Sequence, residues 1–173
     1  MRVQGENYRR DMGIRSYPFL VYALVTLSAL VLQAWLPHFL HGYTWFDLPL
    51  VVTIYFALSR RDPIQGTIMG AAMGIFEDAL TNHAVGVSGI AKSVAGFLAG
   101  SVGVRIDVDN FIVRVLITFS LSLLSGAIYV LIYRVLLGMD QDWRGLQELM
   151  KAVGSSTIAM VLFPLLDMTQ RRD

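Results

Sequence analysis

Long apolar stretches alternate with short polar ones along the chain. The apolar runs cover residues 17–36, 44–59, 64–80, 87–104, 111–137 and 146–166. Most of them approach the ~20 residues that a helix needs to cross ~30 Å of hydrocarbon. This pattern predicts an all-α integral membrane protein, with six transmembrane helices in one compact bundle over residues 17–167, a short N-terminal segment at 1–16 and a tail at 168–173.

Composition supports the same class of protein. Hydrophobic residues make up 55% of the chain and charged residues 16%, whereas roughly a quarter of the residues in soluble domains are charged. The mean hydropathy is +0.57. No connection between the runs is long enough to fold as a separate domain, so we expect the protein to act in or beside the membrane.

Basic residues gather at alternate connections between the runs. Arginine occurs in the N-terminal segment, in the second and fourth connections, and in the tail. Cytoplasmic loops of membrane proteins retain an excess of Lys and Arg, so both termini are predicted to be cytoplasmic. We expect a basic cytoplasmic edge that lies against anionic lipid or a cytoplasmic filament; its members are Arg9, Arg10, Arg60, Arg61 and Arg105.

Small residues recur at helical spacing in the third and fourth runs. Gly66, Gly70 and Gly74 are four residues apart, and the next run holds Gly96 and Gly100 beside an alanine stripe formed by Ala91, Ala95 and Ala99. Such stripes let two helix backbones approach closely when lipid removes the hydrophobic drive for association. Packing within the bundle is the favoured interpretation, and a docking face for another membrane protein is the alternative.

Three charged residues lie beside these stripes. Asp78 continues the glycine stripe, Glu77 lies on its flank, and Lys92 lies near the start of the following run. Charge within hydrocarbon is costly unless it is paired. An Asp78–Lys92 pair between the third and fourth helices therefore fits the spacing, as does exposure of both groups to the outer headgroups. Arg114 and Arg134, which bracket the fifth run, are expected to reach opposite interfaces.

The sequence offers little for catalysis or metal binding. His38 and His41 share a loop rather than a helix face, which leaves only two good ligands and predicts no metal site. Cysteine is absent, and no serine follows the pattern of a nucleophile elbow. The basic residues form a flank without interleaved aromatics, which argues against nucleic acid as a partner. We therefore expect a non-enzymatic protein without a cofactor.

The central forty residues carry a family resemblance. The segments GIFEDAL, HAVGVSG and AKSVAGFLAG, within residues 64–103, resemble the bacterial rod shape-determining protein family MreD. The positions of that family's pattern are occupied here by Gly66, Gly70, Gly74, Asp78 and Gly86. The resemblance implies a bacterial inner-membrane component of the cell-wall elongation machinery. It would act with MreC, the MreB filament, and the RodA glycosyltransferase with its penicillin-binding transpeptidase.

The MreD family is in turn similar in fold to the substrate-binding S components of energy-coupling-factor vitamin transporters. This similarity supplies an alternative function as a solute-binding subunit. S components typically carry an Ala-x-x-x-Ala stripe on their first helix, and residues 17–36 contain no pair of small residues four apart. A scaffold is thus the leading prediction, a transporter subunit the second and a channel the third. Association of two copies of the chain stays open.

Overall fold

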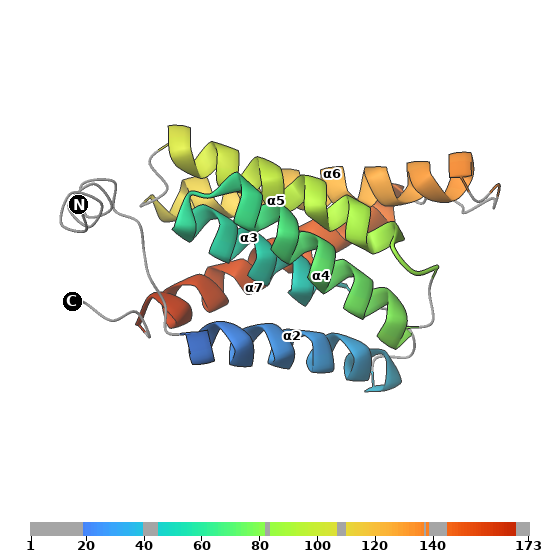
Figure 1. Ribbon diagram of the computed structural model, residues 1–173, viewed down its shortest axis with the longest axis horizontal. Coiled ribbons are helices and arrows are strands. Elements are labelled where there is room, and N and C mark those ends of the chain that lie inside the picture. The colour runs from blue at the N-terminus through green and yellow to red at the C-terminus, as the bar shows by residue number, and fades with distance from the viewer. Residues whose placement is uncertain are drawn as a thin grey trace, which may run out of the picture.

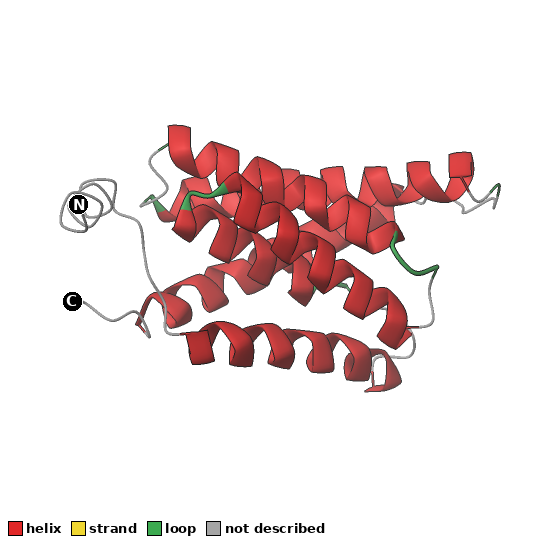
Figure 2. Cartoon of the chain, viewed as in Figure 1, coloured by secondary structure: helices red, strands yellow, loops and turns green. Residues whose placement is uncertain are grey.

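The apolar runs correspond closely to the helices of the computed structural model, which describes residues 19–39, 45–81, 84–106, 110–136, 138 and 145–168. Within these ranges the chain is all-helical and contains no strand. Figure 2 shows these described residues as helices with a few loops between them. The elements are α2 (Phe19–Phe39), α3 (Leu48–Arg60), α4 (Pro63–Thr81), α5 (Val87–Arg105), α6 (Phe111–Leu136) and α7 (Gly145–Met168).

Successive helices run in opposite directions. The start of α2 and the end of α7 therefore lie at the same end of the bundle (Figure 1). Arg60 and Arg105, the last residues of α3 and α5, belong to this end, which we call the Arg60 end. The start of α3, the end of α4 and the start of α5 form the opposite end, which we call the Lys92 end.

Helix α3 is the centre of the bundle. It contacts α2, α4, α5, α6 and α7, and residues 49–59 are buried. Its 13 residues extend for only about 20 Å, less than the ~30 Å thickness of the hydrocarbon layer. The helix starts at Leu48 rather than at residue 44 as the apolar run predicted. Its apolar sequence thus reflects contact with other helices on every side.

Three helices are long and apolar enough to cross a membrane. They are α5, α6 and α7, while the apolar parts of α2 and α3 are shorter. The outside of these helices carries large apolar side chains such as Ile112 and Val161, which are 66% and 71% exposed. An apolar outer surface is what a lipid environment requires. The chain therefore has the character of a membrane protein.

Glycines hold α4 and α5 together. A Cβ added to Gly70 would overlap the carbonyl of Lys92, one on Gly74 would overlap Ser88 and Gly89, and Gly66 and Gly96 meet backbone to backbone. The members of this glycine seam are Gly66, Gly70 and Gly74 of α4 with Gly89 and Gly96 of α5. Gly100 packs in the same way, since a Cβ added there would lie 2.7 Å from the backbone of Asp62 and Pro63. These glycines are used in packing within one chain.

The seam makes Gly70 intolerant of even one methyl group. Because the added Cβ would meet backbone atoms that cannot rotate away, we expect Gly70→Ala to lower the free energy of unfolding by about 1–3 kcal/mol, as overpacking typically does. Gly145→Ala is the matched control, since nothing lies within 4 Å of its position. Thermal unfolding of both variants in detergent measures the difference; equal midpoints would contradict the close approach.

Candidate functional site

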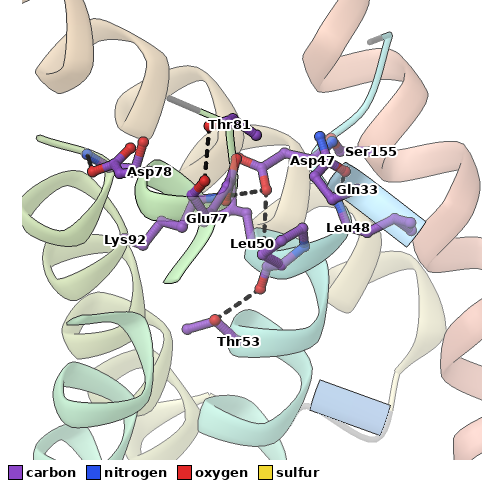
Figure 3. Close-up of polar contacts among 12 residues, drawn as sticks. Gln33, Asp47, Leu48, Leu50, Thr53, Glu77, Asp78, Thr81, Lys92 and Ser155 are labelled. Atoms are coloured by element: carbon purple, nitrogen blue, oxygen red, sulfur yellow. Dashed lines mark hydrogen bonds and ion pairs between the residues drawn. The ribbon is translucent and has the colours of Figure 1, made fainter. Parts of the chain in front are cut away.

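A buried charge cluster lies at the Lys92 end of the bundle (Figure 3). The side chain of Lys92 is 2% exposed and forms ion pairs with both Asp47 and Glu77. Glu77 comes from the last turns of α4, and Asp47 precedes α3. A buried ammonium is tolerated only when carboxylates compensate its charge. Lys92 therefore joins three elements that are far apart in the sequence.

Asp47 has two structural roles. It caps the N-terminus of α3, because its Oδ1 accepts a hydrogen bond from the backbone N–H of Leu50 at 2.9 Å. Aspartate is among the best residues for this position. The same oxygen faces Lys92, while the backbone N–H of Asp47 donates to Ser155 Oγ of α7 at 3.1 Å. The cap thus links α3 to both α5 and α7.

Gln33 fixes this segment from the side of α2. Its Nε2 donates to the carbonyl of Phe46 at 3.2 Å, and its Oε1 accepts from the N–H of Leu48 at 3.1 Å. Gly154 allows the approach from α7, since a Cβ there would overlap the Trp45 carbonyl. The backbone that carries Asp47 is therefore held by two helices, and its carboxylate reaches Lys92 in a fixed position.

Asp78 does not pair with Lys92, which corrects the predicted Asp78–Lys92 pair. Its carboxylate is fully buried, and Oδ2 accepts hydrogen bonds from the N–H groups of Gly86 at 2.8 Å and Ser88 at 3.0 Å. These free N–H groups at the start of α5 are the natural partners of a carboxylate. Gly86 adopts a left-handed φ of 101°, a conformation that glycine accommodates without strain.

A second buried ion pair lies near the Arg60 end. Arg114 of α6 is 4% exposed and donates from Nη1 to Asp167 Oδ2 of α7 at 2.8 Å. Tyr55 of α3 donates its hydroxyl to the other oxygen of Asp167 at 2.7 Å. The guanidinium also lies 4.9 Å from the centre of the Phe163 ring. Arg114 is thus held inside the bundle, and the prediction that it reaches the interface was wrong.

Asp47 and Asp167 were not predicted as ion-pair partners, although the sequence contains an indication of each. Asp47 directly precedes Leu-Pro-Leu at the start of an apolar run, which is the arrangement expected of an N-cap. Asp167 follows the last apolar run, at the same end of the six-helix topology as Arg114. Two opposite charges at one end of antiparallel helices can pair, but the sequence does not say which helices are neighbours.

The remaining predicted positions have different outcomes. Arg60, Arg61 and Arg105 lie at one end of the bundle, whereas Arg9 and Arg10 lie outside the described residues. His41 and the side chain of His38 also fall outside them. Among the described residues, no group of three or more His, Cys, Asp or Glu side chains could hold a metal ion.

Comparison with known proteins adds no assignment. No family model matches the chain, and neither a curated protein nor a solved structure matches it significantly. The arrangement of the site therefore has to be interpreted from its own chemistry. Within the described residues, the buried charged groups contact carboxylates, backbone N–H groups or aromatic rings that tie helices together.

The Lys92 cluster predicts a specific coupling. We expect Lys92→Met to destabilise the protein by about 3–5 kcal/mol, because removal of the ammonium leaves two carboxylates uncompensated. In a double-mutant cycle with Glu77→Gln, the second substitution should recover part of this loss, with a coupling of at least about 1 kcal/mol.

The matched control for this cycle is Asp78→Asn with Lys92→Met. Asp78 neighbours Glu77 in sequence but bonds to the backbone of α5, so its coupling to Lys92 should be smaller. Chemical or thermal unfolding in detergent gives both values. A larger coupling for Asp78 than for Glu77 would contradict the observed pairing.

Proposed function

We propose that this chain is a multi-pass scaffold of the bacterial inner membrane that belongs to the cell-wall elongation machinery. In this role it binds MreC and organises RodA and its penicillin-binding transpeptidase beside the MreB filament. The proposal is supported by one observation, in which the same residues have two roles. The residues that carry the resemblance to MreD, from Gly66 to Gly86, are the residues that set the contact between α4 and α5.

The proposed placement has six spans with both termini in the cytoplasm. Alternating helix directions support it, because they put Arg60, Arg61 and Arg105 at one end of the bundle (Figure 1). Positive charge at one end is the usual mark of the cytoplasmic side. Helix α3 is short, but it is enclosed by other helices, so the bundle rather than α3 alone has to match the bilayer.

A scaffold uses charge to fix its shape rather than to transform a substrate. Lys92 contacts two carboxylates, Asp78 caps a helix, and Arg114 pairs with Asp167. Each of these contacts joins separate elements of the fold. Because these charged groups are used in contacts within the fold, we favour a non-enzymatic role. In this role, helix faces provide the binding energy for protein partners.

A solute-binding subunit is the second candidate. The side chains of Asp47 and Glu77 remain 23% and 14% exposed at the Lys92 end, which is the outer end in the proposed topology. A cationic group of a solute could meet carboxylate oxygens there. The scaffold remains preferred, because Lys92 already pairs with both carboxylates from within the protein.

Affinity purification from native membranes distinguishes the two functions. The tagged chain should be expressed in a rod-shaped bacterium depleted of its own MreD and extracted in mild detergent. We expect mass spectrometry to find MreC or RodA in an amount close to that of the tagged chain. We also expect the cells to regain their rod shape. An unrelated six-span protein with the same tag is the control. Recovery of a coupling ATPase or a bound vitamin, with cells that stay round, would contradict the scaffold.

A further inference from the structure

An apolar groove runs along the outside of the bundle between α2 and α4. Its volume is about 640 Å³, within the ~300–1,000 Å³ of typical ligand sites. The wall from α2 includes Thr26 and Leu30, and the wall from α4 includes Ile68, Ala72 and Phe76. Among the described elements α2 contacts only α3 and α4, so this side of α2 is open to the surroundings.

The groove is polar at one end only. Arg60, Gln65 and Tyr22 form that end, and the guanidinium of Arg60 lies 5.3 Å from the centre of the Tyr22 ring. Arg60 also donates from Nη1 to the Gln65 side chain. Beyond these three residues the lining is apolar apart from Thr26. An occupant should therefore have one polar end and a long apolar body.

The length of the groove selects among such occupants. From Gln65 to Phe76 the α4 wall rises about 16 Å, at 1.5 Å per residue. This is close to half of the ~30 Å hydrocarbon layer, or one leaflet. A transmembrane helix of a partner would need apolar contact across both leaflets, whereas one acyl chain of a lipid needs only one.

The charge at the polar end selects the headgroup. No carboxylate among the described residues forms an ion pair with Arg60. A guanidinium binds phosphate oxygens in a bidentate manner. A choline group would bring another cation to the same place, while an anionic headgroup would not.

We propose that the groove holds one acyl chain of an anionic phospholipid from the leaflet at the Arg60 end, with its phosphate on Arg60 and Gln65. The proposal rests on the membrane placement given under the proposed function and on no protein partner. The bound lipid fills the space between α2 and α4, so it completes the outer surface of the bundle where α2 is least supported.

Native mass spectrometry of the purified full chain tests this directly, with phosphatidylglycerol and phosphatidylcholine as the probes. We expect one phosphatidylglycerol per chain, bound more tightly than phosphatidylcholine. Arg60→Gln should weaken it about tenfold, since a charge-assisted contact is lost. Ala72→Trp should abolish binding by filling the groove. Arg105→Gln is the control, because Arg105 is exposed and ends α5, away from the groove lining.

Equal binding by Arg60→Gln and Arg105→Gln, or equal binding of the two lipids, would overturn the proposal. A photo-reactive residue at position 72 of the otherwise unchanged chain gives a second readout in membranes. A lipid adduct supports the proposal, whereas a cross-link to another protein or to a second copy overturns it. Because the purified chain is tested without MreC, failure to recover MreC would leave the lipid result unaffected.

Discussion

The close approach of α4 and α5 is the constraint on which the rest of the structure depends. The space that a side chain on Gly70 would fill is taken by the backbone of Lys92, and the space beside Gly74 is taken by Ser88 and Gly89. This register turns the Lys92 side chain towards Glu77 and brings the start of α5 over Asp78. Two charged contacts thus follow from the absence of two side chains. In lipid, where apolar burial gives little drive for association, such packing contributes directly to stability.

Helix α3 is also held in place by contacts with its neighbours. Because it is enclosed on all sides, its ends have to be positioned by neighbours rather than by solvent. Asp47 does so at the start through Lys92 and Ser155, and Tyr55 does so nearer the end through Asp167 and its partner Arg114. Buried ion pairs add little net stability compared with apolar packing, but breaking one is costly. They therefore suit a fold in which the helices keep fixed positions relative to one another.

The helices themselves could be predicted because apolar runs and helix lengths are local properties of the sequence. The glycine interval also predicted which faces of residues 64–80 and 87–104 allow a close approach. Pairing was harder to predict. Asp78 lies on the correct face, but its carboxylate accepts hydrogen bonds from the N–H groups of Gly86 and Ser88 instead of pairing with Lys92. Lys92 pairs with Asp47, which is 45 residues away in the sequence. Arg114 was assigned to the interface for the same reason, since its partner depends on the contact between α6 and α7.

Cysteine pairing between α4 and α5 tests the register most directly, because the natural chain has no cysteine. A Cβ at Gly89 would lie 3.0 Å from the Ile75 side chain, so Ile75→Cys with Gly89→Cys places two thiols within disulfide reach. After mild oxidation in membranes, both thiols should resist maleimide-PEG. In the control, Ile68→Cys with Gly89→Cys, the α4 position moves by seven residues, about 10 Å along the helix, and the thiol at the exposed position 68 should react. Protection of the thiol at position 68 in the control, with reactivity of the thiol at position 75 in the first pair, would contradict the glycine-determined register.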